Sequence, residues 1–155
     1  MREFTDDEIL SILRKNTSRS GSGMLIGTDI VSVDCAAGTA LVRFTATPQF
    51  VNPIHLVHGG LLTAMLDETM GTAAAAKARL KLAFPTLDIR VSFLSPAKPG
   101  TLYCEGRALE IGRSIAFLEG TLRDESGRHI AEATATAAVI ESPKRTARYE
   151  PPPGP

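Results

Sequence analysis

Most of the residues that could carry out chemistry lie in one short stretch, from Asn52 to Glu68. Gly59 and Gly60 open a long apolar run predicted to be helical, so their backbone N–H groups lack intrahelical partners. Glycine lets a ligand approach the backbone closely, and the positive end of the helix dipole favours an anion or a developing oxyanion. Taken alone, however, the two glycines are better explained by a structural role, in which they allow a sharp turn from the loop into the helix.

Two adjacent carboxylates, Asp67 and Glu68, are the only charges in the apolar run 59–76. A buried carboxylate is unfavourable unless it is paired or hydrogen-bonded. These residues therefore have either a catalytic role or a structural partner such as Arg90 or Arg107, and the pattern leaves both open. Adjacent helical positions point about 100° apart, so we do not expect both carboxylates to serve one site.

Other chemical arrangements are less well supported by the spacing. His55 and His58 are three residues apart, but no third metal ligand lies at a suitable spacing and Pro53 places them in a loop. We therefore expect no metal site, and His58 is expected to be structural or to orient a carbonyl. Ser92 and Ser114 lack a Gly-x-Ser-x-Gly context, which disfavours a serine-hydrolase triad.

Composition excludes several classes of protein. The 17 basic and 17 acidic residues give no net charge, which argues against nucleic-acid and polybasic membrane partners. The two cysteines, Cys35 and Cys104, are expected to be small buried hydrophobic residues. Residues 1–8 lack the apolar segment of a secretion signal, and adjacent carboxylates at residues 67–68 argue against a membrane span. We expect a cytoplasmic protein.

The elements that would position the candidate residues follow from periodicity and turn signals. A capping box at Thr5–Glu8 predicts a short amphipathic helix to about residue 14, followed by a linker over 16–23. The run from Gly59 to about Leu80 predicts a helix of roughly 30 Å. Alternating or turn-bounded apolar segments predict strands over 24–33, 39–46, 86–93, 101–111, 115–123 and 128–140.

This order of elements indicates an α+β protein in which a curved antiparallel sheet wraps around one long helix. The strand after Pro85 is expected to be half-buried, and the alanines at 131, 133, 135 and 137 would let the sheet approach the helix closely. We expect one domain over residues 1–141 and a flexible tail over 142–155. Open sheet edges are commonly paired across a dimer, so we also expect a homo-oligomer.

Four segments share their order and spacing with one known family: Asn52, His58-Gly59-Gly60 with Asp67, Pro85 to Ala97, and Gly112-Arg113-Ser114. They resemble the hotdog-fold acyl-CoA thioesterases, and within that superfamily the phenylacetic-acid-degradation, PaaI-like group. The similarity covers roughly residues 23–140. It implies a hotdog fold, to which the predicted short N-terminal helix is added, an acyl-CoA or aryl-acyl-CoA substrate and no cofactor. It also implies a homo-oligomer of hotdog dimers, for which we expect a tetramer while a simple dimer stays open.

The resemblance also implies roles for individual residues. Asn52 would place the substrate, the Gly59 N–H would polarise the thioester carbonyl, and Asp67 would act as general base for water or as nucleophile. Thr86 would hold the water. The family's sites form between two subunits, so Asp67 and Thr86 are expected to face each other across a dimer. His58 would steady the loop or the thioester.

The remaining implied contacts are with coenzyme A. Arg113 and Ser114 would contact its phosphates, and Gly60 would also lie at the substrate. Glu68 departs from the pattern, because its spacing from His58 makes it the second choice for the catalytic carboxylate.

The sequence leaves alternatives to the hydrolase open. One is a non-catalytic acyl-CoA or lipid-binding hotdog module, and another is an enoyl-thioester hydratase, whose Asp and His pair we do not find. A binding module has no need of a carboxylate beside a thioester, so Asp67 together with Asn52, Gly59 and Thr86 favours the enzyme. Met65, Met70 and Phe93 could line an aromatic or an aliphatic acyl pocket.

Overall fold

The computed structural model describes residues 3–142 of the 155-residue chain, so the expected tail lies outside the described residues except for Ser142. Three α-helices and a short 3-10 helix accompany the strands: α1 (Asp6–Thr17), α2 (Gly21–Leu25), η1 (Pro48–Phe50) and α3 (Gly59–Lys77). The strands are β1 (Asp29–Asp34), β2 (Thr39–Ala46), β3 (Leu82–Ala83), β4 (Thr86–Phe93), β5 (Gly100–Ile111), β6 (Ile115–Asp124), β7 (His129–Ala138) and β8 (Ile140–Glu141).

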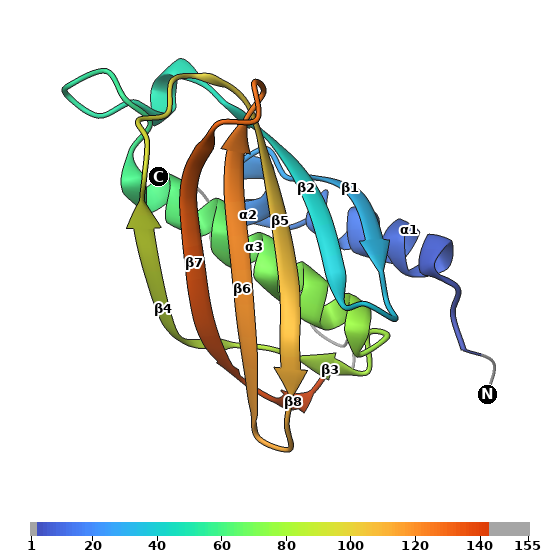
Figure 1. Ribbon diagram of the computed structural model, residues 1–155. Coiled ribbons are helices and arrows are strands. Elements are labelled where there is room, and N and C mark those ends of the chain that lie inside the picture. The colour runs from blue at the N-terminus through green and yellow to red at the C-terminus, as the bar shows by residue number, and fades with distance from the viewer. Residues whose placement is uncertain (1–2, 143–155) are drawn as a thin grey trace, which may run out of the picture.

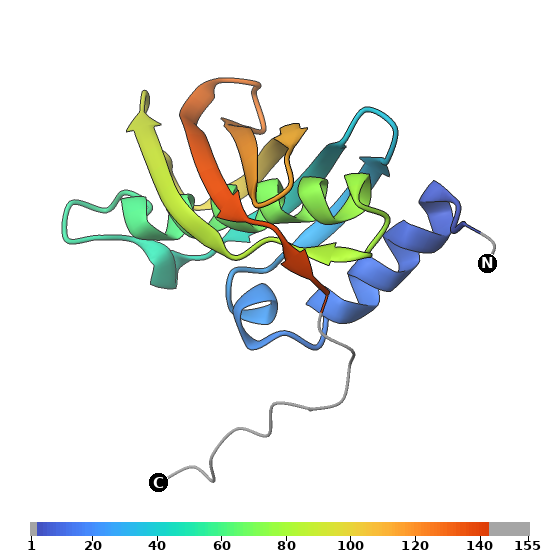
Figure 2. The same ribbon diagram turned by 90° about the horizontal axis from the view of Figure 1, so that it is seen from below.

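Six of the strands form one antiparallel sheet in the order β1-β2-β5-β6-β7-β4. The sheet curls around α3, which lies in its concave face (Figures 1 and 2). The α+β class and the hotdog arrangement expected from the sequence are confirmed. One consequence matters for the site: within residues 3–142, β4 is an edge strand, with β7 on one side and no neighbouring strand on the other.

Helix α3 is buried because small residues let the sheet approach it. The four inward-facing alanines of β7 are all buried, as expected: Ala131, Ala133, Ala135 and Ala137. On β5, a Cβ added to Gly106 would lie 2.6 Å from the carbonyl oxygen of Thr69 on α3. A side chain at position 106 would therefore push the helix away from the sheet. Among the described residues, no helix is both long and apolar enough to cross a membrane.

The N-terminal region differs from the prediction. The capping box forms as expected, with Thr5 and Glu8 bonding each other's backbone, but α1 extends to Thr17. Residues 21–25 form α2, because the Ser20 side chain accepts the Gly23 N–H and starts a new helix. The predicted strand over 24–33 is therefore wrong at its start, and β1 spans Asp29–Asp34.

The chain leaves α3 earlier than predicted. Arg79 and Leu80 have φ values of 48° and 63°, so the left-handed backbone ends the helix at Lys77 instead of near Leu80. This turn leads into β3, which pairs with β8. Neither two-residue strand was predicted, because segments this short carry no periodic signal.

Strand β4 is more exposed than the half-buried strand that its alternation predicts. Ile89 and Val91 are half-buried against the core, but Leu87 is 60% exposed and Phe93 is 53% exposed. The reason is the strand's position at the edge of the sheet, because the rest of the same chain does not pack against its two ends.

Candidate active site

The N-terminus of α3 presents one free backbone donor. His58 is the N-cap residue, and its Nδ1 accepts the Gly60 N–H at 2.9 Å. The His58 carbonyl accepts the N–H groups of Leu61 and Leu62. Within residues 3–142 the Gly59 N–H has no hydrogen-bond partner, so it is the donor available to a ligand. This geometry is compatible with the expected role of the Gly59 N–H as a donor to a thioester carbonyl. The Gly60 N–H, in contrast, already donates to His58.

The loop before α3 is held by the side chain of Asn52. Its Oδ1 accepts the N–H groups of Ile54 and Leu56, both at 3.1 Å. His55 lies in the loop that these bonds hold, and its φ of 61° places it in the left-handed region. No hydrogen bond of the Asn52 side-chain nitrogen occurs in the described part of the chain, so this nitrogen can donate to a ligand.

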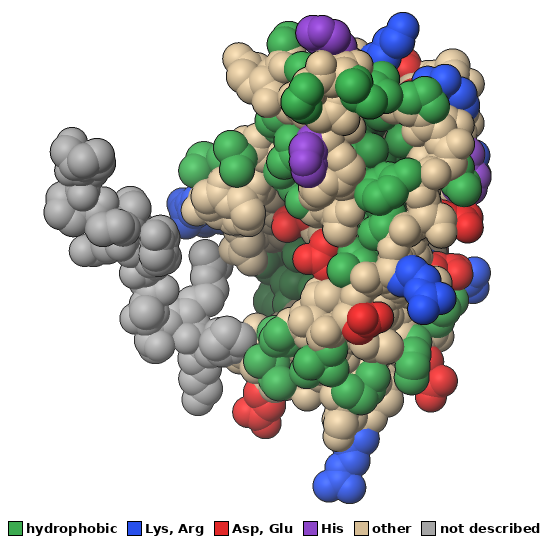
Figure 3. All heavy atoms as spheres, turned by 90° about the vertical axis from the view of Figure 1, so that its left-hand side faces the viewer, with side chains coloured by type: hydrophobic (Ala, Val, Ile, Leu, Met, Phe, Trp, Pro, Cys, Tyr) green, Lys and Arg blue, Asp and Glu red, His purple; other side chains and the backbone are tan. Residues whose placement is uncertain are grey.

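Asn52 and Gly59 line a common pocket of about 290 Å³. Its other walls are mainly apolar and come from the 52–57 loop, α3 and the end of β4: Leu56, Val57, Leu62, Phe93, Leu94, Ser95, Pro96 and Ala97. Figure 3 shows this side of the molecule, where hydrophobic side chains gather around acidic ones and histidines. The pocket therefore combines polar donors with a surface that suits an apolar group.

Asp67 and Thr86 form a second group of functional side chains. The Thr86 hydroxyl donates to Asp67 Oδ1 at 2.7 Å, within one chain. The expectation that these two residues face each other across a dimer is therefore wrong. Thr86 is the first residue of β4, and α3 packs against this strand, which brings the two side chains together without a partner.

The two groups do not meet within one chain. Asp67 lies eight residues after Gly59 on α3, which corresponds to about 12 Å along the helix axis. Neither Asp67 nor Thr86 lines the pocket that contains Gly59. A single chain therefore carries two separate halves of the expected site.

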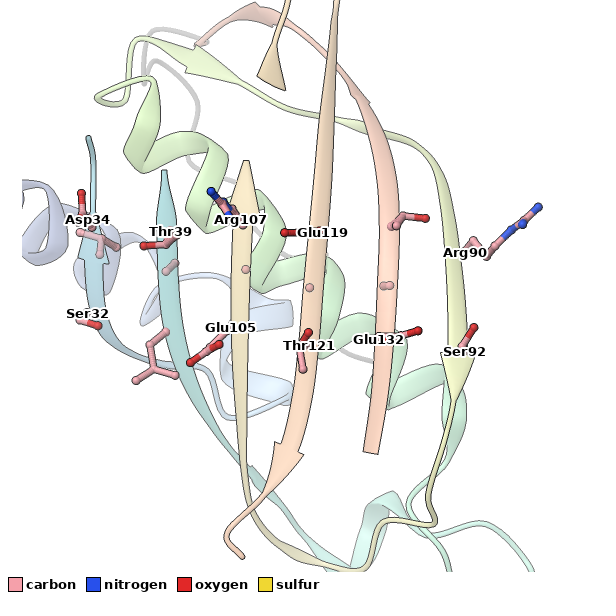
Figure 4. Close-up of a pocket in the computed structure, with 17 residues that line it drawn as sticks. Ser32, Asp34, Thr39, Arg90, Ser92, Glu105, Arg107, Glu119, Thr121 and Glu132 are labelled. Atoms are coloured by element: carbon pink, nitrogen blue, oxygen red, sulfur yellow. The ribbon is translucent and has the colours of Figure 1, made fainter. Parts of the chain in front are cut away.

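Glu68 is also half-buried on α3. Burial, and to a smaller degree the neighbouring Asp67 charge, raise the pKa of the Glu68 carboxyl. Neither Arg90 nor Arg107 pairs with these carboxylates in the described structure, because both arginines lie on the sheet face that points away from α3 (Figure 4). The purely structural role proposed for the carboxylates thus lacks its expected partners.

A larger hollow of about 870 Å³ lies on that outer face of the sheet (Figure 4). Its walls carry charges of both signs, including Arg107, Glu105, Glu119 and Glu132. None of the expected site residues lines it. We therefore place the candidate active site on the α3 side of the molecule, despite the smaller volume there.

Arg113 and Ser114 are exposed in the turn between β5 and β6. This turn lies at the end of the sheet opposite the N-terminus of α3 (Figure 1). The N–H of Val139, the residue after β7, donates to the Ser114 carbonyl in this turn. The contact of these residues with coenzyme A phosphates stays a prediction.

No group of three or more His, Cys, Asp or Glu side chains in residues 3–142 is placed to hold a metal ion. Cys35 and Cys104 are free and buried, as expected. Burial raises the pKa of Cys35 to about 11 and that of Cys104 to about 12, so both thiols stay protonated near neutral pH.

Comparison with known proteins identifies the family of the chain. The model of the thioesterase superfamily matches residues 55–131. The phenylacetic acid degradation-related protein of Ralstonia eutropha JMP134 is 32% identical, with a TM-score of 0.76 over 84% of this chain and 98% of that one. The chain belongs to the thioesterase superfamily, and the expected PaaI-like resemblance is confirmed.

Two named enzymes are among its relatives. The 1,4-dihydroxy-2-naphthoyl-CoA hydrolase of Listeria monocytogenes is 26% identical over 119 residues, 77% of this chain and 95% of that protein. Human acyl-coenzyme A thioesterase 13 is 28% identical over 109 residues, 69% of this chain and 77% of that protein. The enzyme class expected from the sequence, a thioester hydrolase, is confirmed.

Proposed function

We propose that this protein hydrolyses acyl-CoA or aryl-acyl-CoA thioesters to the free acid and coenzyme A. The observation that carries the proposal is the free Gly59 N–H, which lines an apolar pocket together with Asn52. A thioester is already activated, so its hydrolysis requires an oxyanion donor, a positioned water and one base. The CoA substrates in the names of the two enzymes above support this class of substrate.

The proposed reaction uses both halves of the site. The Gly59 N–H and the Asn52 side-chain N–H donate to the thioester carbonyl oxygen, and the acyl group enters the apolar pocket. Asp67 accepts a proton from a water whose other hydrogen bond goes to the Thr86 hydroxyl oxygen. Attack of this water gives a tetrahedral oxyanion, which collapses and expels the coenzyme A thiolate.

The two halves can meet when two copies pair through β4. Thr86, which bonds Asp67, begins this edge strand, and Phe93, which contacts Gly59, ends it. Antiparallel pairing of two β4 edges places the start of one strand beside the end of the other. Asp67 and Thr86 of one copy would then face Asn52 and Gly59 of its partner, and each dimer would hold two sites.

Release of free thiol tests this function. The purified protein is given a panel of aliphatic and aromatic acyl-CoAs, and we expect repeated turnover of at least one of them. Binding of acyl-CoA without thiol release from any member would identify a binding module instead.

The attacking group is tested separately by single turnover in ¹⁸O-labelled water. Direct attack of water puts the label in the acid product of the first turnover. Label in the Asp67 carboxylate would instead reveal a covalent anhydride that water opens at the Asp67 carbonyl, whereas an anhydride opened at the acyl carbonyl labels the acid as direct attack does.

A further inference from the structure

Phe93 lies directly against the start of α3. Phe93 pairs with Ala131 of β7, which is buried on the sheet face toward α3, so the two side chains share that face. A Cβ added to Gly59 would lie 3.1 Å from Cζ of Phe93. The next two atoms, at 3.4 and 3.5 Å, belong to the same ring. The ring is therefore in van der Waals contact with the residue that carries the free N–H.

The Phe93 ring explains why position 59 is a glycine. Gly59 does not have a positive φ, so its backbone conformation is open to any residue. In the described structure, the three atoms nearest to a Cβ at this position all belong to Phe93. A Cβ at position 59 would therefore displace the ring by a few tenths of an ångström, so the ring rather than the backbone favours glycine here, and we treat the two residues as a matched pair.

The ring also limits the space beside the donor. The pocket of about 290 Å³ lies just below the range for small-molecule sites, about 300–1,000 Å³. Phe93 is one of its walls and is 53% exposed, so its ring can move without opening the core. A carbonyl oxygen bonded to the Gly59 N–H would bring the adjacent carbon of the acyl group close to this ring.

We infer that Phe93 selects the acyl group by its bulk at the carbon next to the carbonyl. Acyl groups that are small at this carbon fit beside the ring, whereas branched or cyclic groups have to displace it. The inference rests on the proposed function, because it assumes that Gly59 binds the thioester carbonyl.

Replacing the ring tests the inference. We compare Phe93→Ala and Phe93→Leu with the wild type on acetyl-, isobutyryl- and benzoyl-CoA. Loss of the ring is expected to raise the ratio of kcat/KM for benzoyl-CoA to that for acetyl-CoA on the order of tenfold in Phe93→Ala, and less in Phe93→Leu. Phe117→Ala is the matched control, since Phe117 is 49% exposed on β6 and lies outside the pocket. An equal fall in kcat/KM for all three substrates in Phe93→Ala would overturn the inference.

A double-mutant cycle tests the matched pair. Gly59→Ala keeps the backbone N–H, so we expect it to lower kcat/KM on the order of tenfold only while the ring is present. In the Phe93→Ala background the same change should have little effect, and an equal loss in both backgrounds would contradict the pairing. If the wild type turns over no acyl-CoA, the proposed function fails instead, and acyl selection is then measured from the Kd values of the same compounds by calorimetry.

Discussion

At the scale of single residues, hydrogen bonds distinguish the roles of adjacent residues that the sequence alone does not distinguish. The motif places His58, Gly59 and Gly60 next to each other, but only the Gly59 N–H is free, because His58 caps the N–H of Gly60. The sequence predicts the candidate residues from their types and spacing. It could not predict which N–H is free, because that depends on the conformation of one imidazole.

Asn52→Asp separates the two roles of this side chain. Aspartate keeps an oxygen that can accept the Ile54 and Leu56 N–H groups but loses the side-chain N–H. We expect the thermal midpoint to change little while kcat falls by about 10²-fold, as for a lost oxyanion donor. Steady-state kinetics and thermal unfolding of the same sample provide the check. Unchanged kcat would limit Asn52 to shaping the loop.

His58 is expected to act through the helix cap. His58→Ala removes the acceptor of the Gly60 N–H and should lower the free energy of unfolding by about 0.5–2 kcal/mol. His58→Asn supplies another capping side chain and should restore most of the stability and of kcat. Denaturant unfolding and kinetics of both variants measure this. A His58→Asn protein that is stable but inactive would show that the imidazole touches the substrate.

At the scale of elements, the strongly periodic segments are the ones predicted correctly. The long apolar helix and the strands from β4 to β7 are all present, with small changes at their ends. The segment around α2 was predicted incorrectly because a serine cap, rather than periodicity, starts this helix. The Asp67–Thr86 bond could not be predicted either, because it depends on how closely β4 approaches α3.

Burial of Glu68 on α3 gives the fold a pH dependence. A raised pKa means that the folded state binds the Glu68 proton more tightly than the unfolded state does. The ionised carboxylate therefore destabilises the fold above the folded-state pKa, and this penalty disappears as the pH falls below the unfolded-state pKa. Glu68→Gln should raise the free energy of unfolding at neutral pH but not in acid.

Denaturant unfolding across this pH range measures the effect. Glu119→Gln, on the outer face of the sheet, serves as the control for loss of one carboxylate. If Glu68→Gln raises the free energy of unfolding by the same amount at every pH, ionisation of Glu68 is not the source of the pH dependence.

At the scale of the whole molecule, the division of the site into halves predicts that two inactive variants restore each other. Asp67→Asn and Asn52→Asp chains are unfolded together and refolded as a mixture. Heterodimers then contain one intact site, with Asn52 from one chain and Asp67 from the other, so about a quarter of wild-type activity should return. Separately refolded variants are the control. No recovery in a mixture that forms heterodimers would place each complete site within one chain. The tetramer implied by the resemblance stays a prediction, which sedimentation of the wild type would test.

In the proposed reaction, Asp67 activates water for attack on an acyl-CoA thioester. The most direct measurement is kcat for thiol release by the wild type, Asp67→Asn and Glu68→Gln with the best acyl-CoA of the panel. We predict a loss of about 10²–10⁴-fold in Asp67→Asn, as expected when a general base is removed, and a change of no more than a few-fold in Glu68→Gln. Turnover that survives in Asp67→Asn and disappears in Glu68→Gln would contradict the account and move the role to the neighbouring carboxylate.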